Sequence, residues 1–227
     1  MPLGYRIFTS IDRPDPELVA ALGEHFSADL ADSMRKAGAV STDIKPLYAP
    51  MPRFAGPAVT ASLPTASFSM GKMAMDQCQA GDVLILNAHG DVQHAMFGGH
   101  IAHALKVRGL AGVIVDGAVR DVSELQAEQL PVFARGTTVI VGGHDGPGEI
   151  NVPVALGGVV VKPGDIVVAD SDGIVVVPIE FAEDVLKAVR ELKERHNASH
   201  DQLAQGVIPG NSAILDRIAR DGCELIG

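Results

Sequence analysis

An arginine and an aspartate stand side by side just after an apolar segment, in the stretch "GVIVDGAVRDVSEL" from Gly112 to Leu125. Residues 112–116 are expected to form a buried strand, and Arg120 and Asp121 follow shortly after its end. Ligands of α/β proteins gather beyond the carboxyl ends of strands. There an aspartate can hold a hard cation, and an arginine can bind a carboxylate or an enolate oxygen. A simpler role is equally well supported, in which Asp121 starts a helix and Arg120 is solvated or pairs with it.

A second stretch with chemical potential is "FGGHIA", from Phe97 to Ala102, which precedes an expected helix. Two glycines allow the backbone to approach a ligand closely, and the first amides of a helix point toward a bound anion. Taken alone, the glycine pair is explained better by an ordinary turn from a loop into a helix.

Four histidines lie within fifteen residues, which raises the question of a zinc site: His89, His94, His100 and His103. His100 and His103 lack the H-E-x-x-H arrangement of zinc proteases, and no second cluster of ligands is visible. The histidines are therefore expected at exposed or helix-capping positions, with His100 able to face a ligand.

The elements that must position these residues alternate between strands and helices up to about residue 139. Asp15 and Pro16 read as the N-cap and first turn of a helix that Gly38 ends. After residue 139, short β-rich runs are divided by Gly, Pro and Asp, as is typical of hairpins, and turn chemistry explains their aspartates better than metal binding does. Strands are expected at 83–86, 112–116 and 131–134, and helices at 16–37, 69–79, from near Asp121, at 180–204 and near 211–222.

The whole chain of 227 residues has 47% hydrophobic and 20% charged residues, which is ordinary globular composition. We expect one domain over 1–227, with an N-terminal arm at about 1–15 and a C-terminal helical segment at about 180–227. The net charge of −10 argues against a nucleic-acid-binding surface. No apolar run approaches the ~20 residues of a membrane-spanning helix. Two distant cysteines and the lack of a signal-peptide pattern favour a cytoplasmic protein.

The motifs join in "GGHIAHALKVRGLAGVIVDGAVRD", which resembles the pattern of the RraA-like proteins. That family includes the class II 4-hydroxy-4-methyl-2-oxoglutarate aldolases, also called 4-carboxy-4-hydroxy-2-oxoadipate aldolases. The likeness continues through "LPVFARGTT" and "NVPVALGGVVVKPGDIVVADSDGIVVVP" and covers roughly residues 25–205. It implies a β-rich α/β sandwich of the swivelling β/β/α type. It also implies a homo-oligomer, a trimer or a hexamer, with sites between subunits.

The resemblance also implies roles for individual residues. Asp121 matches the family's direct ligand of Mg²⁺ or Mn²⁺, and Arg120 matches the residue that binds the pyruvyl oxygen of a 2-oxo acid substrate. Asp32, and Glu194 on the C-terminal helix, are candidates for acidic residues that reach the site of a neighbouring subunit. The loop that holds the substrate carboxylate through its backbone amides corresponds to Gly98, Gly99, His100 and Ile101.

Gly99 departs from the family pattern, because the characterised aldolases carry an acidic residue there. Either His100 takes over its part or the position is vacant. We therefore expect oxaloacetate decarboxylation to survive better than aldol cleavage, and Gly99→Asp to restore cleavage. The implied activity is that of a metal-dependent lyase acting on 2-oxo acids through a pyruvate enolate. The alternative is an RraA-type regulator that binds a protein partner such as a ribonuclease.

Overall fold

The computed structural model describes residues 4–64, 66–143, 145–224 and 226. The chain divides into two compact units, Met1–Val189 and Arg190–Gly227. The second unit is helical in its described part and holds the end of α6 (Ala182–Ala198), α7 (His200–Ala204) and α8 (Asn211–Arg220). Among the described residues, no helix is both long enough and apolar enough to cross a lipid bilayer.

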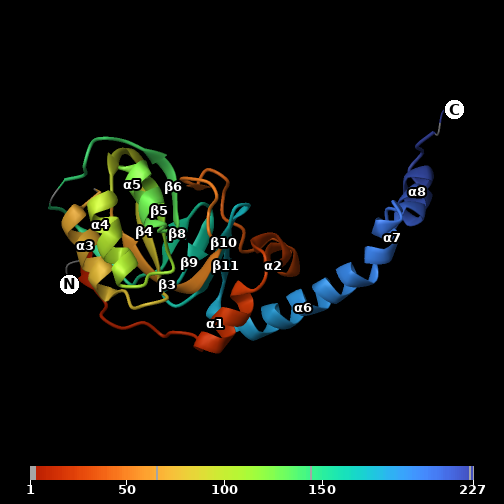
Figure 1. The fold of residues 1–227 in the computed structure, drawn as a ribbon, viewed down its shortest axis with the longest axis horizontal. Coiled ribbons are helices and arrows are strands. Elements are labelled where there is room, and N and C mark those ends of the chain that lie inside the picture. Colours follow the sequence, from red (N-terminus) through yellow and green to blue (C-terminus); the bar gives the residue numbers. More distant parts are fainter. Residues whose placement is uncertain (1–3, 65, 144, 225, 227) are drawn as a thin grey trace. The chain divides into compact units, whose positions relative to one another are not determined.

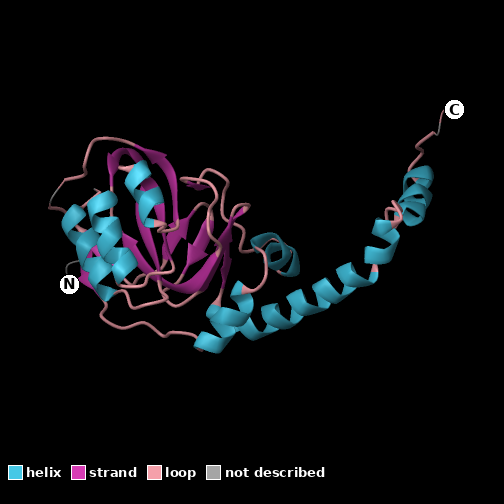
Figure 2. Cartoon of the chain, viewed as in Figure 1, coloured by secondary structure: helices cyan, strands magenta, loops and turns pink. Residues whose placement is uncertain are grey.

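The centre of the first unit is a run of four neighbouring parallel strands in the order β3, β4, β5, β6 (Figures 1 and 2). Helices connect these strands, as parallel pairing requires. The strands are β3 (Phe54–Ser62), β4 (Val83–Ala95), β5 (Gly112–Val119) and β6 (Val132–Thr137). The connecting helices are α3 (Phe68–Gln77), α4 (Gly99–Val107) and α5 (Val122–Glu128).

A second β layer branches from β3, because the two halves of this strand have different partners. Residues 54–57 pair with β10, whereas residues 58–62 pair with β4. The strand β10 (Ile166–Asp170) pairs in turn with β11 (Gly173–Val177). The remaining strands are β1 (Tyr5–Ile7), β2 (Lys45–Pro46), β7 (Gly148–Ile150), β8 (Val154–Leu156) and β9 (Val159–Val161).

Alternation of side chains along β4 explains how the layers are held together. Leu84 and Leu86 face the cluster that includes α3, α4 and α5, whereas Val83 and Ile85 face the cluster formed with β8 to β11. All four side chains are fully buried. A third cluster joins the outer face of β10 and β11 to α1 (Pro16–Gly23), α2 (Ser27–Ser33) and the start of α6. The β-rich α/β sandwich expected from the sequence is therefore confirmed.

The N-terminal helix expected over 16–37 is wrong as a single element, because the chain forms α1 and α2 instead. The cap at its start is confirmed, since the Asp15 side chain accepts a hydrogen bond from the amide of Glu17. The break has a tertiary cause. Buried Asp170 accepts hydrogen bonds from both the amide and the hydroxyl of Ser27, at 2.8 and 2.6 Å, and so fixes a new helix start there.

Two other elements differ from expectation in length. The strand expected at 83–86 runs on to Ala95, with register shifts against β5 between Asn87 and Asp91 and between Asp91 and Ala95. The helix expected at 180–204 begins with a 3-10 turn at Ile179–Phe181 and is interrupted at Ser199, whose hydroxyl donates to the carbonyl of His196. A serine bonded to its own backbone in this way weakens a helix.

Candidate functional site

Arg120 and Asp121 lie directly beyond the carboxyl end of β5, whose eight residues are all buried. Asp121 adopts a left-handed backbone conformation, with φ of 61° and ψ of 41°. A residue other than glycine reaches this region at a cost in energy, and such residues cluster at functional sites. The chain therefore turns sharply at Asp121 before α5 begins.

The Asp121 side chain does not perform the capping role that its position offers. Asp121 is the N-cap residue of α5, yet its carboxylate makes no cap hydrogen bond to that helix. Instead, Oδ2 accepts from the amide of Gly99 at 3.2 Å and lies 3.3 Å from Nε of Arg120. The carboxylate is thus directed to the start of α4. Its position before α5 and its pairing with Arg120 also agree with the simpler interpretation.

Gly98 is the residue that allows this close approach. A Cβ atom on Gly98 would lie 2.2 Å from Asp121 Oδ2 and 2.7 Å from Arg120 Cγ, so no other residue fits without displacing the pair. The two segments are also joined through the backbone, because the amide of Arg120 donates to the carbonyl of Phe97 at 3.1 Å. The glycine loop and the Arg120–Asp121 turn therefore form one structure.

Of the four loop amides expected to hold a carboxylate, two already have acceptors. The amide of Gly99 donates to Asp121, and that of Ile101 donates to the carbonyl of Gly98 at 3.1 Å. Among the described residues, the amides of Gly98 and His100 have no acceptor. These two groups at the N-terminus of α4 are the ones able to bind an anion.

Two hollows meet at Arg120 and Asp121. One, of about 360 Å³, is lined further by Val122 and by Thr137 to Val139. The other, of about 240 Å³, is lined by the glycine loop and by Lys72 on α3. Lys72 Nζ lies 5.5 Å from the centroid of the Phe68 ring. Sequence reasoning missed Lys72, because nothing in the local pattern brings α3 to this edge. The second hollow thus has two cationic side chains, Lys72 and Arg120, against the one carboxylate of Asp121, which suits a small anionic ligand.

Gly99 has a neighbour that the sequence did not reveal. A Cβ atom on Gly99 would lie 2.0 Å from Oε2 of Glu124 and 2.5 Å from its Cβ. Gly99 is the first residue of α4, and Glu124 is in the first turn of α5. Both helices follow adjacent parallel strands, so their starts meet at one edge of the sheet.

Three of the four clustered histidines have nearby partners of their own. His94 pairs with Asp91 at 2.7 Å, His103 pairs with Glu128 at 3.0 Å, and His89 lies 3.0 Å from the Ser62 hydroxyl. Within the described residues there is no group of three or more His, Cys, Asp or Glu side chains able to hold a metal ion. Any cation at Asp121 would have to complete its coordination with water or substrate.

Of the two acidic residues expected to serve a neighbouring subunit, Asp32 is not brought to the site of its own chain. Asp32 is exposed on α2, which packs on the outer face of β10 and β11. The helix α4 packs on the opposite face of the parallel strands. Glu194 is exposed and belongs to the second compact unit. Their assignment to a shared site stays a prediction.

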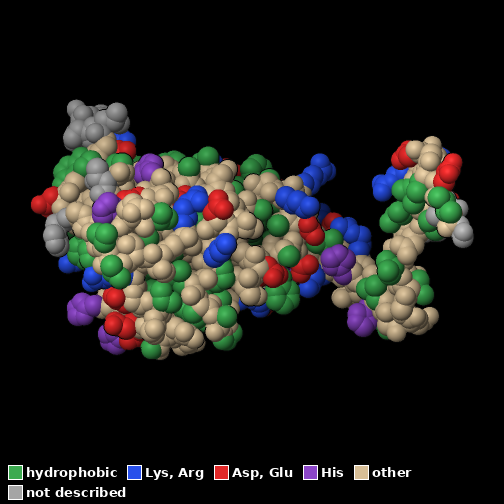
Figure 3. Space-filling model, turned by 90° about the horizontal axis from the view of Figure 1, so that it is seen from above, with side chains coloured by type: hydrophobic (Ala, Val, Ile, Leu, Met, Phe, Trp, Pro, Cys, Tyr) green, Lys and Arg blue, Asp and Glu red, His purple; other side chains and the backbone are tan. Residues whose placement is uncertain are grey.

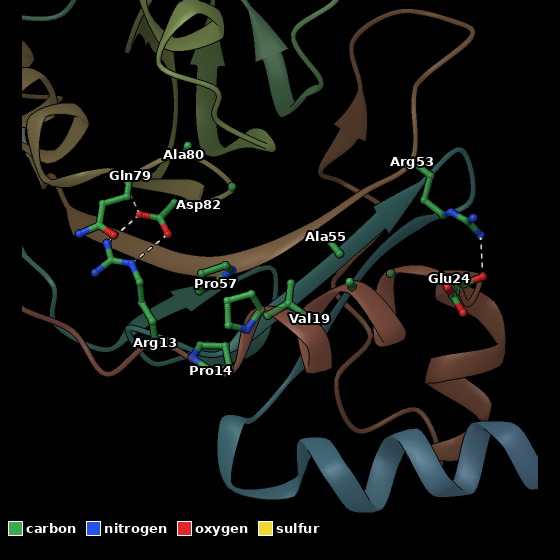
Figure 4. Close-up of a pocket in the computed structure, with 14 residues that line it drawn as sticks. Arg13, Pro14, Val19, Glu24, Arg53, Ala55, Pro57, Gln79, Ala80 and Asp82 are labelled. Atoms are coloured by element: carbon green, nitrogen blue, oxygen red, sulfur yellow. Dashed lines mark hydrogen bonds and ion pairs between the residues drawn. The ribbon is translucent and has the colours of Figure 1, made fainter.

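A larger cavity, of about 560 Å³, lies away from this site (Figure 4). Its arginines are already engaged, since Arg13 forms two hydrogen bonds with the buried carboxylate of Asp82, at 3.1 and 2.8 Å, and Arg53 donates to the carbonyl of Glu24. Asp82 directly precedes β4, so this cavity borders the amino ends of the parallel strands. Ligand sites of α/β sheets lie at the other edge.

Positive and negative side chains are interspersed on the face of the molecule shown in Figure 3. In the face shown in Figure 3, the described Lys and Arg side chains lie among Asp and Glu side chains. This face therefore has no continuous basic surface. The cationic side chains near the glycine loop are therefore those that line the hollow, Arg120 and Lys72.

Fold and site together define an α/β protein with a polar site at the carboxyl edge of its parallel strands, made of a helix start, an arginine and an aspartate. The chain belongs to the RraA-like family, whose model, described as Aldolase/RraA, matches residues 27–176. The family expected from the sequence is therefore confirmed.

Individual relatives agree with this family. A protein of Halalkalibacterium halodurans, provisionally named a 4-hydroxy-4-methyl-2-oxoglutarate aldolase, is 33% identical over 79% of this chain and 85% of its own. The 4-hydroxy-4-methyl-2-oxoglutarate aldolase of Thermus thermophilus is 36% identical over 47% of this chain and 65% of its own. The crystal structure of Streptomyces coelicolor RraAS2, described as an unusual member of the RNase ES inhibitor RraA family, matches with a TM-score of 0.76 and 30% identity. That match covers 84% of this chain and 99% of the RraAS2 chain.

Proposed function

We propose that this protein is a divalent-metal-dependent lyase that acts on 2-oxo acids through a pyruvate enolate. The reactions would be aldol cleavage of substrates like 4-hydroxy-4-methyl-2-oxoglutarate, decarboxylation of oxaloacetate, or both. The observation that carries the proposal is the Asp121 carboxylate, which is held between Arg120 and the first amide of α4 instead of capping its own helix. The names of the aldolase relatives support the lyase class.

The surroundings of Asp121 fit a hard divalent cation. Within the described part of the chain, both polar contacts of its side chain engage Oδ2, which leaves Oδ1 available. Mg²⁺ is commonly held by one or two carboxylates and keeps several waters, so a single protein ligand is sufficient. Asp121 would hold Mg²⁺ or Mn²⁺ in this way. When bound, such a cation supplies Lewis-acid polarisation of the substrate's 2-oxo group.

The protein's own groups account for the rest of substrate binding. The open amides of Gly98 and His100 would hold the carboxylate next to the 2-oxo group. The Arg120 guanidinium, with 42% of its side chain exposed, would donate to the 2-oxo oxygen, where negative charge develops as the enolate forms. Lys72, which lines the same hollow, would attract a second carboxylate at the far end of the substrate.

The two reactions differ in what they demand of the site. In both, the electrons of the breaking C3–C4 bond move into the enolate that Arg120 stabilises. Aldol cleavage also requires a group that removes the proton of the C4 hydroxyl, whereas decarboxylation of oxaloacetate does not. The ratio of the two rates therefore reports on the presence of such a group.

The test is a screen of 2-oxo acids with Mg²⁺ and Mn²⁺, with pyruvate formation as the readout, on wild type and Asp121→Asn. The asparagine keeps an oxygen that can accept from Gly99 but loses the charge, so we expect turnover to disappear while thermal unfolding is unchanged. Asp76→Asn is the matched control, because Asp76 is exposed and pairs with Arg108 away from the site. Full activity in Asp121→Asn, or in protein stripped of metal with a chelator, would contradict the proposal.

A regulator is the second candidate function, and the likeness to RraAS2 favours it. A regulator that binds a ribonuclease has no use for a polarised 2-oxo acid site. The same screen separates the two functions, because a protein that forms pyruvate at a metal-dependent rate with any of the substrates is an enzyme.

The proposed active form is a trimer or a hexamer in which Asp32 and Glu194 reach the site of a neighbouring subunit. The expected masses in solution are three or six times 23.7 kDa. Light scattering combined with the turnover assay tests this. A fully active monomer would contradict the shared site.

A further inference from the structure

At the edge of the site, the Glu124 side chain fills the space that a side chain on Gly99 would need. The clash that a side chain on Gly99 would meet involves not only the mobile end of Glu124 but also its stem, with Cβ at 2.5 Å and Cδ at 2.7 Å. An acidic residue at position 99 could therefore enter only if α5 moved. This is why the expectation that Gly99→Asp restores cleavage meets a steric obstacle.

The geometry directs a carboxylate of α5 to the place where the family's acidic residue would be. A Cβ on Gly98 would meet Oδ2 of Asp121 at 2.2 Å, and a Cβ on Gly99 would meet Oε2 of Glu124 at 2.0 Å. Two consecutive glycines at the start of α4 thus lie against two successive carboxylates of the neighbouring turn. Asp121 and Glu124 are three residues apart, and these two contacts place both carboxylates beside the start of α4.

The Glu124 carboxylate is unused by the fold. Among the described residues it has no hydrogen-bond or ion-pair partner, although its position in the first helical turn is one where glutamates often bond back to the N-cap amide. Glu128, one turn further along α5, is by contrast paired with His103 at 3.0 Å. Glu124 is exposed to solvent, so its oxygens can accept hydrogen bonds from a ligand.

We propose that Glu124 is the base for aldol cleavage and supplies the carboxylate that Gly99 lacks. The inference rests on the proposed lyase function. The Glu124 carboxylate takes the proton of the C4 hydroxyl, and the electron pair of the broken O–H bond forms the second C4–O bond, so that C4 becomes the carbonyl carbon of the leaving fragment. The C3–C4 bond breaks, and its electron pair forms the pyruvate enolate. The proton then returns to C3 of the enolate, which gives two carbonyl products and leaves Glu124 ionised.

The first test compares two reactions in one variant. Glu124→Gln is expected to lower kcat for 4-hydroxy-4-methyl-2-oxoglutarate cleavage at least about 100-fold, the usual contribution of a positioned base. The decarboxylation of oxaloacetate, which has no hydroxyl proton to remove, is expected to change less than about threefold. Glu128→Gln is the matched control on the same helix and is expected to change neither rate.

A binding readout separates a chemical role from a structural one. Calorimetry with Mn²⁺ and oxalate, which resembles the enolate but has no C4 hydroxyl, is expected to give the same affinity in Glu124→Gln as in wild type. A loss of this binding together with both activities would mean that Glu124 only supports the site, and would overturn the inference.

A swap of the two positions provides the sharpest test. Glu124→Gly removes the stem that fills the space beside Gly99, and Gly99→Asp then places a carboxylate there from α4. The double variant is expected to cleave at least about 10-fold faster than Glu124→Gly alone, with the effect absent in oxaloacetate decarboxylation. No gain in the folded double variant would overturn the inference.

The outcomes distinguish this inference from the proposed function. If wild type forms pyruvate from both substrates, and Glu124→Gln lowers both activities equally or lowers neither, the lyase function is supported and the role of Glu124 as the base is contradicted. If wild type turns over no 2-oxo acid with either metal, both the lyase function and the role of Glu124 are contradicted.

Discussion

Gly98→Ala isolates the steric basis of the site. The added methyl group would lie 2.2 Å from Oδ2 of Asp121, so the carboxylate must move by roughly 1 Å to reach an ordinary contact distance. The hydrogen bond from Gly99 to that oxygen, 3.2 Å long in the structure, would then be lost. Such a bond to a charged group contributes about 1.5–3 kcal/mol. The backbone at Gly98 is extended, with φ of −151°, so alanine adds no backbone strain.

The expected result is a large loss of function in a folded protein. Loss of a group that orients a metal ligand typically lowers metal affinity 10–100-fold, and a displacement of about 1 Å lowers turnover by about 100-fold. Mn²⁺ affinity by calorimetry and kcat/KM for pyruvate formation would both be measured, with thermal unfolding as the check on folding.

Gly71→Ala is the matched control for Gly98→Ala. Gly71 lies within α3, and a Cβ there would meet only ordinary contacts, the nearest being Leu63 Cδ1 at 3.8 Å. This variant is expected to keep full activity and to gain up to about 1 kcal/mol of stability from the better helix propensity of alanine. Wild-type Mn²⁺ affinity and turnover in Gly98→Ala would refute the argument that close packing on Gly98 fixes the Asp121 carboxylate.

Three further predictions concern single side chains. Arg120→Lys keeps the charge but loses the fork of donors, so kcat for pyruvate formation should fall at least ~10-fold, about 1.4 kcal/mol, and a change in KM alone would make Arg120 a ground-state binder. Lys72→Met should raise KM for substrates with two carboxylates about fivefold, as expected from the loss of about 1 kcal/mol, and equal effects on monocarboxylates would contradict its role. Burial raises the pKa of the Cys78 thiol to about 12, whereas Cys223 is exposed, so a thiol reagent at pH 8 should label one cysteine in the native protein and two after unfolding.

Strand and helix patterns of the sequence predict much of the parallel core. The apolar run before Asp116 becomes β5, and the glycine pair at residues 98–99 does precede a helix. The division between α1 and α2 could not be predicted, because its cause is a bond between Ser27 and Asp170, 143 residues apart. Local helical periodicity contains no information about a partner so distant in the sequence.

The site, like the fold, has residues that the sequence could identify and residues that it could not. Arg120 and Asp121 could be singled out because charged residues after an apolar strand are unusual and the family pattern names them. The Asp121 carboxylate lies away from its own helix at a residue with a left-handed backbone, which the sequence does not indicate, because only a few per cent of residues other than glycine adopt that conformation. Lys72 and Glu124 lie on helices whose approach to the glycine loop arises only when the parallel strands align.

The two register shifts in β4 have a consequence for chain length. Asn87 pairs with Asp116 and Ala95 pairs with Ala118, so β4 uses eight steps where β5 uses two. The surplus residues leave the ladder on either side of the pairing between Asp91 and Gly117. Ala95 is held in addition by the carbonyl of Ile140, at 2.7 Å. Residues 92–93 are exposed and lie between the paired residues Asp91 and Ala95. An insertion there would lengthen only the unpaired segment, so a fluorescent label or a tag could be added while the glycine loop stays in place.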